Sequence, residues 1–428
     1  MNRSIFAASA IALSSLAVSQ TEPVARFEAH QDDVLIDEEI PIAVSGLTPQ
    51  ATVVIRLRGG LDGQWTSSAT FTADASGHID LARMAPVKGS YKDVDQMGLF
   101  WSAERGATSS ASEDDADEPA PDEWTLTAEV GGAVVARTSI HRHAVSSNVR
   151  VKPVRDGGMV ATFYEPPGSG AHPAFLVLTG SGGGMPPAAG PAGGLASRGY
   201  AVLALAYFGV EGLPRSLSNI PLEYFGAALR WLAAQPSVDP HRIGVLGGSR
   251  GGELALLLGS IYPTVHTVVA YVPSNVINRG CCDMSTQVAW TYEGRPLAPV
   301  QPMIGRGRGM AFSNMSRPEI PVERIGGAVL LVAGRDDGVW DSAPMAEKIV
   351  ARLRRHDFKF AYQALSYDHA GHGITRPYTS TMNLNSRRHP LTGRTVHMGG
   401  TPAGTAKARD DSWRQMLAFV NQHLRDQP

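Results

Sequence analysis

The chain has 428 residues, with 38 Lys and Arg against 40 Asp and Glu, and its formal net charge is −2. Hydrophobic residues make up 43% of it, which is enough for the cores of more than one domain. This charge balance gives no basis for nucleic-acid binding, and beyond the N-terminal segment no apolar run is long enough for stable membrane insertion.

The N-terminal segment has the three parts of a secretory signal peptide. Met1–Arg3 is short and basic, Ile5–Leu16 is apolar or small, and Ala17–Ser19 fits a small-x-small cleavage site. The apolar run is too short to span a bilayer. We therefore expect residues 1–19 to direct export to the periplasm or the outside of the cell. If the segment is only a disordered leader, the protein is cytoplasmic.

Residues 21–145 are expected to form a small all-β domain. Short runs rich in β-branched residues alternate with clusters of Gly, Pro, Asp and Ser, a spacing typical of an immunoglobulin-like sandwich. The acidic stretch Glu113–Glu118 is expected to be a solvated loop. Residues 146–158 are then a linker. The runs predicted as strands are Pro41–Val44, Val53–Leu57, Ala69–Thr72 and Trp124–Val130.

Residues 159–428 are predicted to form an α/β domain. Strands alternate with helices there, which indicates a mostly parallel sheet covered on both faces. The apolar run Ala174–Thr179 predicts one strand, and the glycine-rich residues 180–184 follow it. This loop lacks the G-K-S/T and G-x-G-x-x-G patterns of nucleotide-binding loops. We therefore expect it to present backbone amides to a substrate rather than to hold a nucleotide.

A serine stands in a G-x-S-x-G frame formed by Gly247, Ser249 and Gly251. The apolar run Ile243–Leu246 before it predicts a buried strand, and apolar residues at helical spacing over 254–261 predict a helix after it. Such a turn exposes the hydroxyl and points the helix N-terminus at it, where partial positive charge favours an oxyanion. We predict that Ser249 is a nucleophile. The alternative is a structural glycine turn.

A nucleophilic serine in this context needs an acid and then a histidine further along the chain. The predicted strand Ala328–Val332 leads into Asp336 and Asp337. This is the end of a parallel strand at which an orienting carboxylate belongs. We prefer Asp337 for this role and keep Asp336 as the alternative.

The predicted strand Phe358–Leu365 leads to two histidines, His369 and His372. We prefer His372 as the base, because it is flanked by glycines in a loop just past the strand and follows a serine and an acid in the expected order.

An oxyanion hole needs two backbone N–H groups. One is expected from Arg250, directly after the nucleophile, and the other from the loop after the strand 174–179. In that loop the donor is Ser181 or Gly182, and the sequence leaves the choice open.

Several segments, in order, resemble the acyl-CoA thioesterase and bile acid-CoA:amino acid N-acyltransferase family. In the first domain they are DEEIPIAVSGLTPQATVVIRLR, SGHIDLARMAPVKGSY and DQMGLFW. In the second they are TGSGGGMP, GYAVLALAYFG, LPRSLSNIPLEYFGAALRWL, GVLGGSRGGELAL, GRDDGVW, YDHAGHGI and WRQMLAFVNQHL. The resemblance implies an α/β-hydrolase domain preceded by a β domain, with a catalytic triad at Ser249, Asp337 and His372.

The resemblance also implies hydrolysis of a small-molecule acyl thioester, acyl-CoA. Thioesterases of that family carry serine at the nucleophile and conjugating members carry cysteine, so Ser249 indicates water as the acceptor. Because acyl-CoA is scarce outside the cytoplasm, an exported carboxylesterase or peptidase with the same triad is an alternative. An acyl-CoA:amino acid N-acyltransferase and a non-catalytic binding protein are the others.

The two cysteines are neighbours, Cys281 and Cys282, so they cannot cross-link distant segments. We expect two thiols, with a vicinal disulfide after export as the alternative. No Cys/His spacing predicts a metal site, and no cofactor is expected. The loop Gly305–Gly309 contains two arginines. We expect it to be a solvated flexible loop, and the alternative is that its guanidinium groups pair with coenzyme phosphates.

Overall fold

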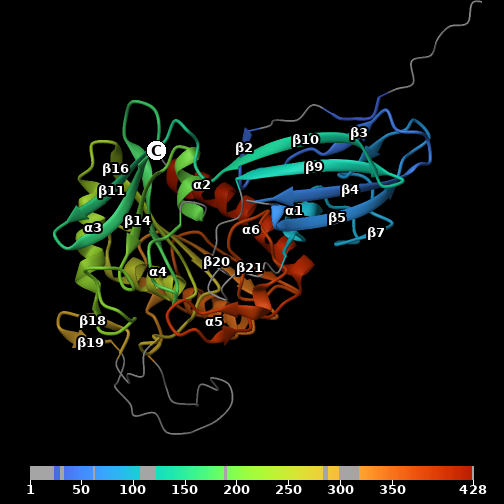
Figure 1. Ribbon diagram of the computed structural model, residues 1–428. Coiled ribbons are helices and arrows are strands. Elements are labelled where there is room, and N and C mark those ends of the chain that lie inside the picture. The colour runs from blue at the N-terminus through green and yellow to red at the C-terminus, as the bar shows by residue number, and fades with distance from the viewer. Residues whose placement is uncertain are drawn as a thin grey trace, which may run out of the picture.

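The computed structural model describes residues 24–28, 33–60, 63–106, 122–187, 190–282, 288–297 and 318–426. They form a β domain and a larger α/β domain, which lie side by side in Figure 1. Three predicted features lie outside the described residues: the signal peptide 1–19, the acidic stretch 113–118 and the arginine loop 305–309.

The β domain contains two sheets. The larger has the strand order β2-β10-β9-β4-β5-β7, with β8 paired to β5, and the smaller has the order β1-β3-β6. Along β4 every second side chain faces inward, and Val53, Ile55 and Leu57 are fully buried. All four runs predicted as strands overlap strands, and a β-rich N-terminal region is confirmed; the short helix α1 interrupts it. The elements are β1 (Arg26–Phe27), β2 (Asp33–Leu35), β3 (Ala43–Ser45), β4 (Thr52–Gly59), β5 (Trp65–Thr72), β6 (Ile79–Asp80), β7 (Lys88–Gly89), α1 (Gly98–Trp101), β8 (Glu104–Arg105), β9 (Glu123–Val130) and β10 (Ala133–His143).

The α/β domain is built on one sheet with the strand order β11-β12-β14-β13-β16-β17-β20-β21. β11 and β12 are antiparallel to their neighbours, and the strands from β14 to β21 are parallel. The predicted mostly parallel sheet of an α/β hydrolase is therefore confirmed. The strands are β11 (Arg150–Asp156), β12 (Met159–Glu165), β13 (His172–Leu178), β14 (Ala201–Ala206), β16 (Val238–Gly248), β17 (Thr267–Tyr271), β20 (Ala328–Gly334) and β21 (Tyr362–Tyr367).

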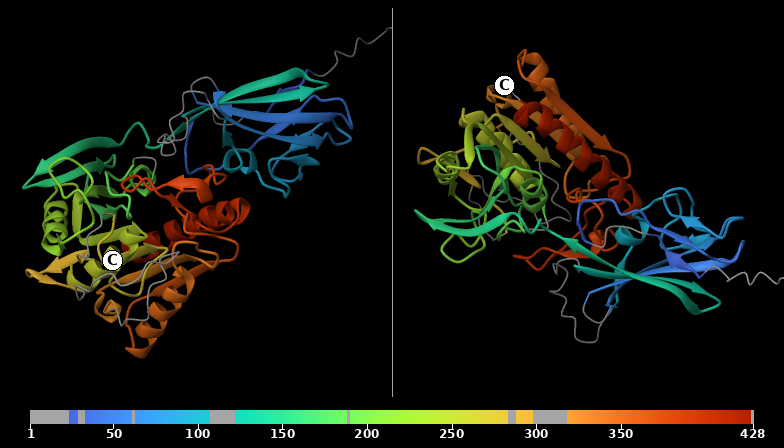
Figure 2. Two further views of the ribbon diagram at one scale, coloured as in Figure 1. Left: turned by 60° about the horizontal axis from the view of Figure 1, so that its bottom comes forward. Right: turned by 90° about the horizontal axis from the view of Figure 1, so that it is seen from above.

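Helices cover both faces of this sheet, as predicted. Residues of α3, α4 and α5 pack in one hydrophobic core, and residues of α2 and α6 pack in another on the opposite face. In Figure 2 the long helix α6 extends from the sheet toward the β domain. The helices are α2 (Pro191–Ser197), α3 (Leu222–Ala233), α4 (Arg250–Ile261), α5 (Ser342–Arg355) and α6 (Pro402–Val420).

Two boundaries differ from the prediction. The linker predicted over 146–158 is wrong for residues 150–156, which form β11 and pair with β12 along its whole length. Only Val154 of this edge strand is buried, so the strand carries almost no hydrophobic signal. The strand predicted over 358–365 begins only at Tyr362, which pairs with Val329 near the start of β20; residues 356–357 form a turn after α5.

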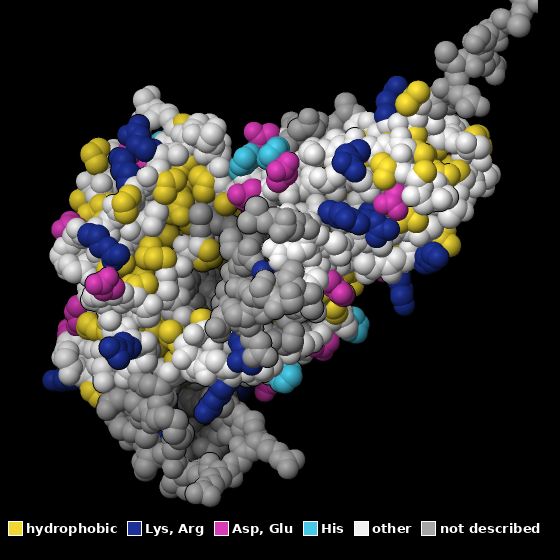
Figure 3. Space-filling view, viewed as in Figure 1, with side chains coloured by type: hydrophobic (Ala, Val, Ile, Leu, Met, Phe, Trp, Pro, Cys, Tyr) yellow, Lys and Arg dark blue, Asp and Glu magenta, His cyan; other side chains and the backbone are white. Residues whose placement is uncertain are grey.

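The surface carries charges of both signs. On the face shown in Figure 3, Lys and Arg side chains are interspersed with Asp and Glu over both domains, in agreement with the formal net charge of −2. Within the part of the chain that the structure describes, no helix is both long enough and apolar enough to cross a membrane.

Candidate active site

Ser249 lies in a sharp turn between β16 and α4. Its backbone has φ 57° and ψ −120°, and its N–H donates to Tyr271 O of the neighbouring strand at 2.9 Å. A left-handed φ in a residue other than glycine costs about 1–3 kcal/mol and persists only where the surrounding structure enforces it. Here β16, β17 and α4 hold the residue in place at the carboxyl edge of the sheet.

Close backbone approach explains both glycines of the G-x-S-x-G frame. A Cβ atom on Gly247 would lie 2.2 Å from Gly251 O, and a Cβ on Gly251 would lie 2.4 Å from Thr179 O. Both distances are far below van der Waals contact, and in each case the obstacle is backbone, which cannot move aside. The frame is therefore a steric requirement for bringing β13, β16 and α4 together around Ser249.

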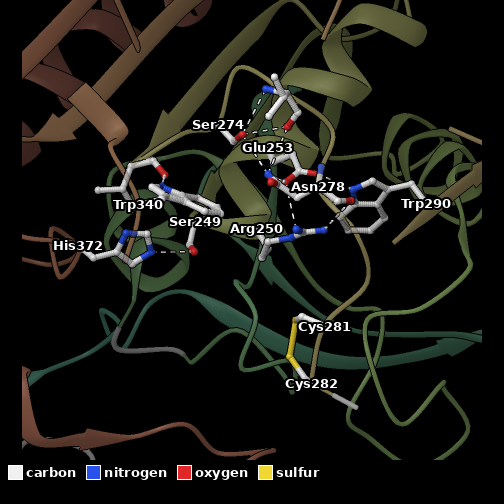
Figure 4. A network of polar contacts seen from close by, with 12 residues as sticks. Ser249, Arg250, Glu253, Ser274, Asn278, Cys281, Cys282, Trp290, Trp340 and His372 are labelled. Carbon is white, nitrogen blue, oxygen red and sulfur yellow. Dashed lines mark hydrogen bonds and ion pairs between the residues drawn. A yellow bond between two sulfur atoms is a disulfide. The ribbon is translucent and has the colours of Figure 1, made fainter. Parts of the chain in front are cut away.

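The structure brings the three residues of the predicted triad together. His372 Nε2 lies 2.8 Å from Ser249 Oγ, and His372 Nδ1 lies 2.8 Å from Asp337 Oδ2 and 3.0 Å from Asp337 Oδ1. Figure 4 shows the imidazole of His372 directed at the Ser249 hydroxyl. Only 1% of the Asp337 side chain and 7% of the His372 side chain is exposed. The arrangement allows the imidazole to take the serine proton while the carboxylate fixes its orientation.

The two alternative residues lie elsewhere. His369 Nδ1 lies 3.5 Å from Asp336 Oδ2, and 75% and 50% of these side chains are exposed. Asp337, in contrast, turns inward and accepts hydrogen bonds from the backbone N–H groups of Val339 at 2.9 Å and Trp340 at 3.2 Å. The geometry therefore favours Asp337 and His372.

Two further residues, Trp340 and Met398, hold His372 in place, and the sequence did not indicate either contact. The Trp340 ring stands edge-on to the His372 ring, with centroids 5.3 Å apart, and its Nε1–H donates to Val272 O at 3.1 Å. Met398 O accepts from the N–H groups of His372 at 2.6 Å and Gly338 at 3.0 Å. The Met398 carbonyl thus connects the loop that holds His372 with the loop that holds Asp337. A backbone acceptor leaves no signal in a sequence.

The glycine-rich loop after β13, residues 180–184, lies beside Ser249. A Cβ on Gly180 would lie 3.9 Å from Ser249 Oγ. Ser181 Oγ lies 3.2 Å from His389 Nε2, and a Cβ on Gly182 would lie 3.1 Å from Pro390 Cγ. The predicted oxyanion residues Ser181 and Gly182 directly follow Gly180 in this loop, and Arg250 begins α4 directly after Ser249. That their amides form an oxyanion hole stays a prediction.

A buried polar network lies behind Ser249 (Figure 4). Glu253, in the first turn of α4, is completely buried. Its carboxylate accepts from Trp290 Nε1 at 2.8 Å, Asn278 Nδ2 at 2.8 Å and Asn278 N at 3.1 Å. Arg250 Nη1 lies 3.4 Å from the same carboxylate. The sequence did not indicate Glu253. Nearly every residue of α4 is buried, so the spacing of apolar residues does not show which side of the helix faces Ser249.

Cys281 and Cys282 form a vicinal disulfide. The expectation of two thiols is therefore wrong, and the alternative pairing is the one found. Cys282 φ is 76°, a conformation that no sequence pattern reveals. The Cys282 sulfur lies 3.2 Å from Ser181 O, which places the disulfide against the glycine loop.

Two family models match successive parts of the chain. The family model described as BAAT / Acyl-CoA thioester hydrolase C terminal matches residues 220–426. The model described as Acyl-CoA thioester hydrolase/BAAT N-terminal region matches residues 37–156. Among solved structures, a dienelactone hydrolase-like promiscuous phosphotriesterase from metagenomic libraries covers 64% of this chain and 97% of its own, at 20% identity and a TM-score of 0.41.

The chain is similar to curated thioesterases over nearly its whole length. It is 32% identical over 410 residues to mitochondrial acyl-coenzyme A thioesterase 2 of Mus musculus, covering 91% of this chain and 87% of the relative. It is 32% identical over 413 residues to the peroxisomal succinyl-coenzyme A thioesterase of Mus musculus, covering 91% and 94%. For acyl-coenzyme A thioesterase 1 of Homo sapiens the identity is 30% over 420 residues, covering 91% and 94%. The chain therefore belongs to the BAAT/acyl-CoA thioester hydrolase family, and it is an acyl-CoA thioesterase-family hydrolase.

Proposed function

We propose that this protein hydrolyses acyl-CoA thioesters to a free acid and CoA, through an acyl-enzyme intermediate on Ser249. The observation that carries the proposal is the chain of hydrogen bonds from Ser249 through His372 to Asp337. His372 Nε2 lies 2.8 Å from Ser249 Oγ, and His372 Nδ1 lies 2.8 Å from Asp337 Oδ2. Relatives at about the same length are thioesterases by name, which supports a CoA thioester as the substrate class.

In the first step His372 Nε2 takes the Ser249 proton as the hydroxyl oxygen attacks the acyl carbonyl carbon. Asp337 holds the proton on Nδ1 and stabilises the imidazolium. The backbone amide of Arg250 and one from Ser181 or Gly182 stabilise the oxyanion, each donor contributing about 3 kcal/mol by analogy with other hydrolases. The C–S bond then breaks, and the thiolate leaves with the proton from His372.

In the second step water replaces the thiol. His372 takes a proton from the water, whose oxygen attacks the acyl-serine carbonyl, and the acid leaves as the proton returns to Ser249 Oγ. A serine nucleophile favours water over an amine as acceptor, because the conjugating members that the sequence resembles carry cysteine there. This favours thioester hydrolysis over N-acyl transfer.

Replacement of the nucleophile tests the mechanism. Ser249→Ala is expected to lower kcat/KM for palmitoyl-CoA by about 10⁴-fold or more, while the circular dichroism spectrum and the thermal midpoint stay close to wild type. The release of CoA is followed with a thiol-reactive chromophore. Wild type, but not the variant, is expected to be labelled by a fluorophosphonate probe. Near-normal hydrolysis by a folded Ser249→Ala protein would remove the proposal.

A substrate panel separates the alternatives. Palmitoyl-CoA, aryl esters and peptides are compared by kcat/KM, and a strong preference for esters or peptides would favour an exported esterase or peptidase. Free acid as the sole product in the presence of glycine or taurine would dismiss N-acyl transfer. We also propose that residues 1–19 direct export, and the N-terminal sequence of protein recovered from its producing cells tests this point.

A further inference from the structure

One long segment of the α/β domain contains basic residues and no acidic ones. Residues 369–409 contain five arginines and one lysine but neither Asp nor Glu, in a chain whose formal net charge is −2. The segment includes the candidate base His372 and ends within α6. Carboxylates of other segments contact it at His369, His372 and Tyr378, outside residues 387–396. The hydrolytic mechanism makes no use of the arginine charges.

A hairpin within this segment lies against the glycine loop of the active site. β22 (Arg387–Arg388) pairs with β23 (Thr395–Val396), and we call residues 387–396 the arginine hairpin. Its His389 Nε2 lies 3.2 Å from Ser181 Oγ, and its Pro390 Cγ would lie 3.1 Å from a Cβ on Gly182. The arginine hairpin therefore borders the loop that lies beside the Ser249 hydroxyl.

Other guanidinium groups lie close to the hairpin. Burial and the charge of Arg387 lower the pKa of Arg376 to about 10. Burial, together with the charges of Arg376 and Arg387, lowers the pKa of Arg409 to about 9. Arg409 donates to Gly373 O at 2.7 Å, next to the candidate base.

We propose that the arginine hairpin, through Arg387 and Arg388, binds the phosphate groups of the CoA leaving group while the thioester lies at Ser249. The inference rests on the proposed function. Guanidinium groups match phosphate oxygens with paired, charge-assisted hydrogen bonds. The pantetheine arm of CoA separates the thioester from the phosphates, so the phosphate site must lie at the border of the active site, where the hairpin is. Arg387 is exposed in this hairpin, and Arg388 next to it is half-buried.

The test compares two thioesters of the same acyl group, one on CoA and one on N-acetylcysteamine, which has no phosphate. Arg387→Ala/Arg388→Ala is expected to raise KM for the acyl-CoA about tenfold or more, the loss of one or more charge-assisted pairs. Hydrolysis of the short thioester is expected to stay within about twofold. Arg387→Lys keeps the charge but loses the planar fork, and is expected to give an intermediate KM.

The chain offers a matched control. Arg354-Arg355-His356 repeats the tripeptide Arg387-Arg388-His389, and both control arginines are exposed. α5 begins near the active site and its 14 residues carry the control pair about 20 Å away. Arg354→Ala/Arg355→Ala is expected to leave KM for both thioesters unchanged. Equal losses on both substrates in the hairpin variant, or no loss on acyl-CoA, would overturn the proposal.

A binding measurement keeps this inference separate from the proposed function. If wild type hydrolyses neither thioester, the proposed function fails, and that failure appears before any arginine is changed. Adenosine 3′,5′-bisphosphate is then titrated into Ser249→Ala by calorimetry, with and without the hairpin substitutions. We expect binding that weakens about tenfold without Arg387 and Arg388, and that weakens as salt is added. No binding, or equal binding by the two proteins, contradicts the phosphate site.

Discussion

At the scale of single residues, the candidate site depends on which of two neighbours turns inward. Asp336 and Asp337 are adjacent, yet half of one side chain is exposed while the other is 99% covered. Backbone N–H groups of Val339 and Trp340 bind the Asp337 carboxylate and hold it toward His372. In the mechanism proposed above, this carboxylate fixes the tautomer of His372, and its charge stabilises the imidazolium that forms during the reaction.

Asparagine at each of the two aspartate positions tests this assignment. Asp337→Asn keeps the shape of the side chain but removes its charge and replaces one of its two acceptor oxygens with an NH2 donor. It is expected to lower kcat by about 10⁴-fold with the fold intact. Asp336→Asn is the matched control and is expected to behave like wild type. Steady-state hydrolysis of palmitoyl-CoA measures both. If the Asp336 variant is the impaired one, the orienting carboxylate is wrongly assigned.

At the scale of elements, an ion pair ties α5 to the short 3₁₀ helix η3 (Val322–Arg324) that precedes β20. Arg352 Nε and Nη2 donate to the two carboxylate oxygens of Glu323 at 2.6 and 2.9 Å, and Arg352 Nη1 donates to Glu319 at 2.7 Å. These hydrogen bonds from Arg352 lower the pKa of Glu323 from the ordinary 4.5 to about 2. The pair thus fixes one end of the strand that leads to Asp337.

The lowered pKa predicts a pH-dependent effect on stability. A carboxyl whose pKa is lower in the folded state stabilises that state above its unfolded pKa, and the contribution is lost as pH falls through the folded value. Glu323→Gln is expected to lower the free energy of unfolding at pH 7 by about 1 kcal/mol, because solvent screens this partly exposed pair. The difference should shrink between pH 4.5 and about 2.

Urea unfolding from pH 7 downward measures this difference. Glu347→Gln is the control on α5: its side chain is 65% exposed and lies 3.8 Å from Arg335, so little change is expected. A loss for Glu323→Gln that stays constant as the carboxyl titrates would exclude an electrostatic origin.

At the scale of the whole molecule, the β domain contacts the segment that follows the candidate base. Arg142 of β10 is 1% exposed and its guanidinium lies 4.5 Å from the Phe100 ring centre. It donates to Tyr378 O in the α/β domain at 2.9 Å and also to Ile36 O in its own domain. Burial lowers its pKa to about 9. The N-terminal domain is therefore joined through buried polar contacts to residues six positions beyond His372.

Removal of this arginine tests how far the domains depend on each other. Arg142→Ala leaves two carbonyls without their donor and is expected to lower the free energy of unfolding by about 2–4 kcal/mol. Turnover should fall as well, because the segment after His372 loses an anchor. Arg137→Ala, an exposed arginine on the same strand, is the control. Urea unfolding and palmitoyl-CoA hydrolysis are the measurements, and identical behaviour of the two variants would show that the contact is dispensable.

The sequence by itself determined the fold class, the strand and helix around Ser249 and the order of the candidate triad. These follow from local rules: apolar spacing defines the elements, and Gly247 and Gly251 stand where a Cβ would strike backbone. The same rules missed β11, whose exposed side chains carry no pattern, and they placed the start of β21 too early.

Only the tertiary structure decided which neighbours act together. It showed that Asp337 and His372 face each other, whereas Asp336 and His369 are exposed. It also buried Glu253 behind Ser249 and paired Cys281 with Cys282. Finally, it placed the arginine hairpin beside the glycine loop. The physical reason is that these contacts join residues whose distance in space depends on how strands order in the sheet and how loops turn at its edge. Two neighbouring residues of a loop can point in opposite directions, one into the site and the other into solvent. No local sequence pattern indicates which residue points inward.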